Sequence, residues 1–137
     1  QEIDKAVSKV LSTPQMYNEN DMAEIIKEAV KNGKPENAAA FYEYMGKTEN
    51  ANLLHAAGLA YEASGNIKQA VSHYKQAFTL DNSAPDICFS RARSADIEGD
   101  YPSAIVFYEL TASRTKNVEL KRNALLRISQ LREYTGH

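Results

Sequence analysis

Apolar side chains recur at intervals of three and four residues along most of the chain, with polar side chains between them. The clearest case lies between residues 51 and 80, where two such stretches flank Ser64-Gly65-Asn66. The apolar positions are Leu53, Leu54, Ala57, Gly58 and Tyr61 in the first stretch and Ile67, Ala70, Val71, Tyr74 and Ala77 in the second. This spacing predicts two short amphipathic helices joined by a tight turn. Such a short pair cannot bury both apolar faces alone, so we expect neighbouring pairs beside it.

The same pattern returns at a nearly constant interval. A glycine is followed by an alanine and then by a tyrosine, in the arrangement Gly-x4-Ala-x3-Tyr, three times along the chain. The three copies are Gly33, Ala38 and Tyr42, then Gly65, Ala70 and Tyr74, and finally Gly99, Ala104 and Tyr108. The interval between copies is close to the period of about 34 residues that is typical of tetratricopeptide repeats.

The chain therefore resembles the tetratricopeptide-repeat family, and the likeness covers about residues 19–134. In this family small residues stand where the two helices of a repeat approach most closely. The matching residues here are Gly58 and Ala70 in one repeat and Ala92 and Ala104 in the next. The chain departs from the family pattern at Asn82, Arg91 and Ala95, where a proline, an aliphatic residue and a bulky residue are expected. The resemblance implies an all-α fold, a right-handed superhelix of antiparallel helix pairs.

We interpret residues 1–137 as one helical-repeat domain, a length that suits a single core. The expected parts are an N-terminal helix at 2–12, repeats at about 19–50, 51–84 and 85–118, and a last helix at 117–134. This last helix is either a capping helix or the first helix of a further, partial repeat. Because Gln1 is not an initiator residue, we expect the chain to begin at an internal boundary or after removal of a segment such as a signal peptide.

The resemblance also implies a concave groove for a partner segment, lined by positions two, five, nine and twelve of each repeat. The corresponding residues are Asn20, Ala23 and Lys27; Asn52, His55, Leu59 and Glu62; Asp86, Phe89, Arg93 and Asp96; and Asn123, Arg127 and Gln130. Phe89 has no core position in this register, so it is a candidate anchor. Arg93 and Arg127 could bind acidic side chains of a peptide. The Lys/Asn set with which chaperone-binding members hold a C-terminal carboxylate is not reproduced, because His55 and Leu59 occupy its first positions.

Charge is unevenly distributed. Residues 1–50 carry six Lys and Arg against nine Asp and Glu, and residues 51–110 carry four against seven. Residues 111–137 carry six against two. The basic end could be a solvated helix face, a surface for an acidic partner, or a site of self-association with the acidic N-terminal part. RNA is a further possibility, but no aromatic side chains interleave with the basic ones, so the sequence argues against nucleic acid.

Nothing in the sequence predicts catalysis, a metal site or a cofactor. His55, His73 and His137 lie far apart, and phosphate-binding glycine motifs are absent. Cys88 falls on a position that packs between helices, so we expect a buried thiol. A single cysteine excludes an internal disulfide and fits a reducing compartment such as the cytoplasm, without excluding an exported protein. No apolar run is long enough for a membrane span.

These observations predict a non-catalytic scaffold or adaptor that binds an unidentified protein or peptide in a groove. Two other functions stay open. One is a chaperone or pilot protein for an exported or assembly subunit. The other is an RNA-binding helical repeat, which predicts steeply salt-dependent binding through the basic C-terminal helix.

Overall fold

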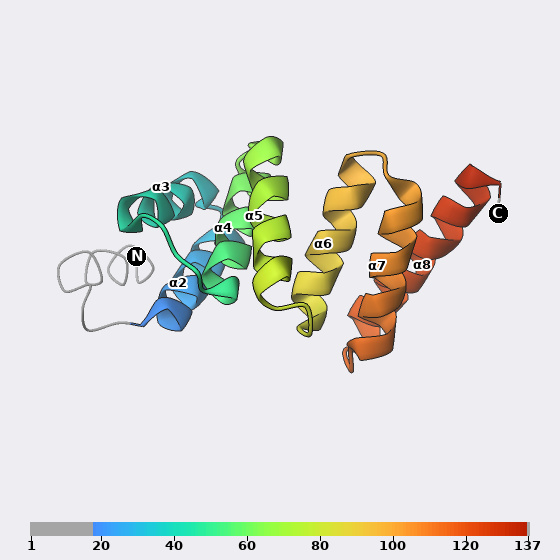
Figure 1. Cartoon of the computed structure of the whole chain (residues 1–137). Coiled ribbons are helices and arrows are strands. Elements are labelled where there is room, and N and C mark those ends of the chain that lie inside the picture. Colours follow the sequence, from blue (N-terminus) through green and yellow to red (C-terminus); the bar gives the residue numbers. More distant parts are fainter. Residues whose placement is uncertain (1–17, 137) are drawn as a thin grey trace. The chain divides into compact units, whose positions relative to one another are not determined.

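Paired α-helices make up the described chain. The computed structural model describes residues 18–136, so the helix predicted at 2–12 lies outside the described residues. Residues 18–136 contain seven helices and no strand. The helices are α2 (Glu19–Lys31), α3 (Pro35–Met45), α4 (Ala51–Ala63), α5 (Ile67–Leu80), α6 (Pro85–Ile97), α7 (Tyr101–Arg114) and α8 (Val118–Thr135) (Figure 1). The predicted all-α fold of helix pairs is confirmed.

Three glycines form equivalent bends between the two helices of each pair. Gly65 has φ +87°, its N–H donates to the Glu62 carbonyl at 3.0 Å, and the next N–H, of Asn66, donates to the Tyr61 carbonyl at 2.8 Å. The same two bonds recur at Gly33 and at Gly99. A residue without Cβ adopts this left-handed conformation at no steric cost, which lets the chain reverse at once into the second helix.

Helix starts are specified by short polar side chains or by proline. The Asn50 side chain accepts a hydrogen bond from the Leu53 N–H at 2.9 Å, and Asn117 caps α8 through the Leu120 N–H at the same distance. Pro35 and Pro85 open α3 and α6, where the fixed φ of proline suits the first turn. These local signals explain where α3, α4, α6 and α8 begin.

The helices form two compact units, one ending at Leu80 and the other beginning at Asp81. In the first unit α4 packs against α2, α3 and α5. In the second unit α7 packs between α6 and α8. None of the described helices has the length and apolar character that a membrane crossing requires.

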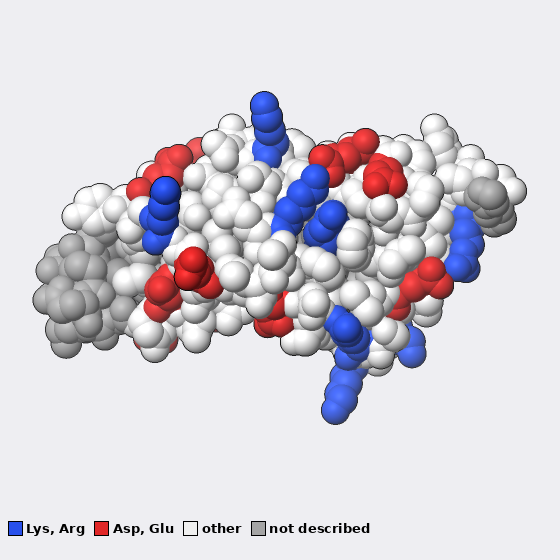
Figure 2. Space-filling model, in the orientation of Figure 1, with Lys and Arg blue, Asp and Glu red and all other residues white. Residues whose placement is uncertain are grey.

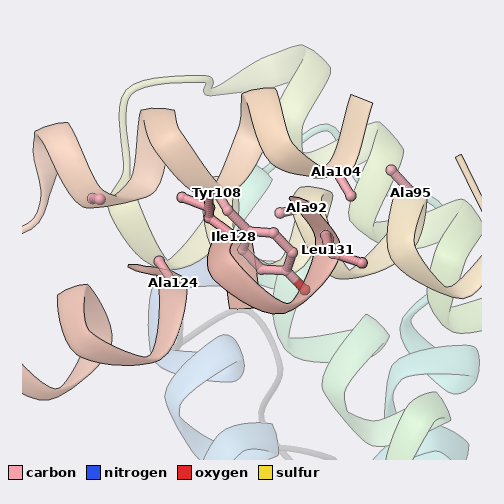
Figure 3. Packing of buried hydrophobic residues seen from close by; sticks show 8 residues of the cluster. Ala92, Ala95, Ala104, Tyr108, Ala124, Ile128 and Leu131 are labelled. Carbon is pink, nitrogen blue, oxygen red and sulfur yellow. The ribbon is translucent and has the colours of Figure 1, made fainter. Parts of the chain in front are cut away.

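The core of the second unit is built largely from alanine. Its buried cluster consists of Ala92, Ala95, Ala104, Tyr108, Ala112, Ala124, Ile128 and Leu131, drawn from α6, α7 and α8 (Figure 3). Methyl groups let helix backbones approach closely, and the larger side chains fill the remaining space. Ala95 is thus well accommodated. Arg91, the other departure from the family pattern in α6, is half-buried with its guanidinium 4.4 Å from the centroid of the Phe107 ring.

The closest approach in the first unit joins α4 and α5. A Cβ added to Gly58 would lie 2.5 Å from the Tyr74 ring. Tyr74 is fully buried, and its hydroxyl donates to Glu62 at 2.6 Å, so the ring has little room to move. Ala92 and Tyr108 occupy the equivalent positions in the next repeat, and both are buried. The glycine therefore sets how tightly α4 and α5 pair.

We predict that Gly58→Ala destabilises the protein by about 1–2 kcal/mol. Overpacking of a filled site costs about 1–3 kcal/mol, and the better helix propensity of alanine offsets up to about 1 kcal/mol of this. Urea unfolding checks the value. In a Tyr74→Leu background, where the ring is gone, the same change should cost less. Equal or higher stability of Gly58→Ala in the native background would show that the helices are not held this closely.

Candidate functional site

Four of the predicted groove residues meet at one pocket in the second unit. The pocket has a volume of about 350 Å³. It is lined by Phe89, Arg93, Asp96, Ile97, Tyr108 and Arg127, which come from α6, α7 and α8. Phe89, Arg93, Asp96 and Arg127 are the predicted members. We call this set of six residues the α6–α8 pocket.

Asp96 holds the charged side of this pocket together. Its carboxylate accepts two hydrogen bonds from the Arg127 guanidinium, from Nε at 2.7 Å and from Nη2 at 2.8 Å. The Tyr108 hydroxyl donates to the same carboxylate at 2.9 Å. Arg127 also donates to the Gln130 side chain at 3.2 Å. One carboxylate therefore connects three helices through charge-assisted hydrogen bonds.

These contacts fix the protonation states of the three groups. The hydrogen bond from Arg127 lowers the pKa of Asp96, and the bond from Tyr108 lowers it further. Burial, followed by the hydrogen bond to Asp96, raises the pKa of Tyr108. The hydrogen bond to Asp96 raises the pKa of Arg127. At neutral pH the pocket thus presents a carboxylate, a phenol and a guanidinium, a set suited to binding by charge and hydrogen bonds.

Phe89 belongs to both the core and the pocket. It is half-buried and packs against the alanine-rich cluster, with its ring 5.5 Å from the Tyr108 ring at 63°. The prediction that Phe89 has no core position is therefore wrong, because Tyr108 provides an aromatic surface on which the ring rests. Its remaining surface lines the pocket beside Arg93 and Ile97.

The predicted positions of the first unit also meet in part. The Asn52 side chain donates to the Asn20 side chain at 3.0 Å, which joins α4 to α2. Lys27 lies 3.5 Å from Glu24 in an ion pair on α2. Glu62 accepts the Tyr74 hydroxyl as Asp96 accepts that of Tyr108, and both pairs are separated by 12 residues.

Two predicted groove residues are buried instead. His55 is 4% exposed, with its ring 5.7 Å from that of Tyr74, and Ala23 is 1% exposed. The cause is that α4 packs against α2, α3 and α5, so it has little free surface. Leu59 on the same helix is half-buried. His55 and Ala23 therefore cannot contact a partner directly, and the prediction that they line an open groove is wrong.

The comparisons with known proteins bear on the repeats just described. Residues 51–83, which contain α4 and α5, match the family model for the tetratricopeptide repeat. The predicted resemblance to this family is confirmed. The comparison with curated proteins found no match.

A solved structure matches over most of the chain. It is the type III secretion translocator chaperone SycD of Yersinia enterocolitica, at 15% sequence identity and a TM-score of 0.73. The match covers 85% of this chain and 85% of that chain. At this identity the likeness establishes a shared helical fold.

The other predicted residues of the second unit lie outside the α6–α8 pocket. Asp86 at the start of α6 is exposed, and so are Asn123 and Gln130 on α8.

Cys88 is fully buried, as predicted, and burial raises the pKa of its thiol. Among residues 18–136 no group of three or more His, Cys, Asp or Glu side chains is placed to hold a metal ion.

The basic end of the chain is partly neutralised by its own contacts. Arg127 pairs with Asp96, and Arg132 lies 3.2 Å from Glu109 in a second ion pair. Arg114 donates to the Asn82 carbonyl. On the face shown in Figure 2, Lys and Arg side chains are interspersed with Asp and Glu side chains. On this face the mixed charge differs from the continuous basic surface that is typical of nucleic-acid binding.

The first unit contains a larger pocket that sequence reasoning missed. It has a volume of about 830 Å³ and is lined by Glu19, Tyr42, Lys47, Thr48, Glu49, Leu54, Gln76, Thr79 and Leu80. Three of these residues lie in the segment between α3 and α4. That segment has no helical periodicity, so no pattern in the sequence could place it beside the end of α5.

We predict that Asp96→Asn lowers the stability at pH 7 by about 1–2 kcal/mol, because it removes charge-assisted hydrogen bonds at a mostly buried carboxylate. The pKa of Asp96 is lowered by folding, so its contribution is present above the ordinary Asp pKa of about 3.9 and is lost as pH falls through the folded value. The difference between the two proteins should therefore shrink below about pH 4. Thermal unfolding as a function of pH measures it.

Glu133→Gln is the matched control for this prediction, since Glu133 is an exposed carboxylate on α8. Its effect should stay within about 0.5 kcal/mol, as for surface substitutions generally. A difference for Asp96→Asn that is the same at every pH would contradict the role of the ionised carboxylate.

Proposed function

We propose that the chain is a non-catalytic protein-interaction module whose α6–α8 pocket holds a segment of a partner protein. The observation that carries the proposal is the meeting of Phe89, Arg93, Asp96 and Arg127 at one pocket, as the repeat register predicts. Sites of this kind combine apolar walls with a few placed polar groups. The known tendency of tetratricopeptide repeats to bind proteins supports the same interpretation.

The walls of the pocket suggest the chemistry of the bound segment. Phe89 and Ile97 provide apolar surface for an aliphatic or aromatic side chain. Arg93 brings a guanidinium group to the same pocket, which favours a neighbouring carboxylate. A volume of about 350 Å³ lies at the lower end of the range for ligand pockets, which suits one or two side chains.

The pocket is also held in shape before binding. Arg127 and Tyr108 are both tied to Asp96, and Phe89 rests on the Tyr108 ring. Groups that are already ordered lose little conformational freedom on association, so a larger part of the contact free energy appears as affinity. This supports recognition of a short segment.

A chaperone for an exported or assembly subunit is the second candidate function. It is supported by the TM-score of 0.73 to SycD, a translocator chaperone of type III secretion, over 85% of each chain. A chaperone of this kind would keep an aggregation-prone subunit in solution at equimolar ratio. A scaffold would bind a folded partner through a segment and leave its solubility unchanged.

We predict that Phe89→Ala combined with Arg93→Ala lowers capture of the partner at least about tenfold, because it removes an aromatic wall and a guanidinium of the pocket. Capture from an extract of the native cell on immobilised full chain, quantified by mass spectrometry, is the measurement. Circular dichroism establishes that helicity is retained, which matters because Phe89 also packs against the core.

Val106→Ala combined with Lys68→Ala provides the matched control, since it removes an exposed aliphatic side chain and an exposed cation that lie outside the pocket. This variant should capture the partner as the native chain does. If the pocket variant keeps its helicity and captures every partner unchanged, the proposed binding site is rejected.

A further inference from the structure

The outer face of α8 differs from the corresponding faces of the other first helices. In α4 and α6 the residues of this face are small or aliphatic, and Gly58 of this face lies against the Tyr74 ring of the second helix, α5. Its residues are Leu53, Leu54 and Gly58 in α4 and Ile87, Cys88 and Ala92 in α6, and all six are buried. Each member of α6 lies one repeat after its counterpart in α4.

The interval that separates the α4 residues from their α6 counterparts, added once more, leads from Ile87, Cys88 and Ala92 to three residues of α8. These are Lys121, Arg122 and Leu126. All three are exposed, and Leu126 is 57% exposed. Two more apolar side chains lie open on this helix, Leu125 at 49% and Val118 at 72%. We call Val118, Lys121, Arg122, Leu125 and Leu126 the α8 outer surface. Exposed leucines side by side on a helix suggest a contact with another molecule.

The α8 outer surface differs in composition from the faces of α4 and α6 against which second helices pack. At the position of closest approach α4 has Gly58 and α6 has Ala92, which are both small and buried, whereas α8 carries the larger Leu126 there. Lys121 and Arg122 replace aliphatic residues, so a packed helix of the usual apolar kind would bury two cations without partners. The surface therefore requires an occupant with a different composition.

We propose that the α8 outer surface binds an amphipathic helix of a partner protein whose apolar residues are flanked by Asp and Glu. The leucines and Val118 would bury the apolar stripe, while Lys121 and Arg122, with the nearby Lys116, would pair with the acidic flanks. A second copy of this surface fits less well, because it would bring a further set of the same cations into the interface. Arg127 faces Asp96 and the α6–α8 pocket, so the two surfaces use different sides of α8.

The test uses the full chain and two designed peptides of about 18 residues, or five helical turns. Both peptides carry leucine at spacings of three and four, and the other positions hold mainly glutamate in one peptide and lysine in the other. Fluorescence anisotropy of the labelled peptides is measured at increasing salt. The native chain should bind the glutamate peptide with an affinity that falls as salt rises, and at least about tenfold more tightly than the lysine peptide.

Two variants separate the apolar and the charged contributions. Leu125→Ser with Leu126→Ser, and Lys121→Glu with Arg122→Glu, should each weaken binding of the glutamate peptide about tenfold. The charge-reversed variant should also gain affinity for the lysine peptide. All four side chains are exposed, so helicity and the melting temperature should change little. Val106→Ser on α7, which removes an equally exposed aliphatic side chain, should bind as the native chain does.

Three results would overturn the proposal. The first is equal binding of both peptides, or no binding of either one. The second is unchanged binding by the two α8 variants. The third is a dimer of the native chain in sedimentation velocity that Leu125→Ser with Leu126→Ser abolishes, since the surface would then belong to a second copy. The pocket variant Phe89→Ala with Arg93→Ala should bind the peptide normally, so failure at one surface is distinguishable from failure at the other.

Discussion

The close pairing of helices around a small residue and a tyrosine is the interaction on which the rest of the structure depends. Gly58 leaves room for the Tyr74 ring. Ala92, at the equivalent position of α6, is buried in the same cluster as Tyr108. Both tyrosine rings are buried between the helices of their pair. Each hydroxyl donates a hydrogen bond to an acidic side chain on the first helix of the same pair, Tyr74 to Glu62 and Tyr108 to Asp96. A packing constraint in the core thereby sets the positions of the Glu62 and Asp96 carboxylates.

This connection explains how the side chains of the α6–α8 pocket are held in place. Tyr108 is a core residue, yet it supports Phe89 by its ring and Asp96 by its hydroxyl. Asp96 in turn holds Arg127 on α8, so three helices contribute to one set of contacts. A change in the core is therefore expected to alter the side chains that line the α6–α8 pocket, the proposed binding site.

The fold was predictable because its signals are local and repeated, whereas parts of the site depend on packing that no local pattern contains. A glycine at each bend and apolar residues at helical spacing define the pairs, and the register placed Asp96 and Arg127 on facing helices. The same repeat register predicted that His55 lines an open groove, but neighbouring helices bury the His55 side chain. It also left Phe89 without a core position, because the supporting ring of Tyr108 comes from another helix. The pocket beside the segment between α3 and α4 has no periodic signal at all.

Nuclear Overhauser contacts in solution test the central claim most directly. The pairing of α4 with α5 requires strong contacts between the α protons of Gly58 and the ring protons of Tyr74. The wall of the α6–α8 pocket requires contacts between the rings of Phe89 and Tyr108. We expect both sets in a spectrum of the folded full chain. Absence of the Gly58–Tyr74 contacts from a well-dispersed spectrum would contradict the close pairing of α4 with α5, because the tyrosine would then not lie in the space that the glycine leaves.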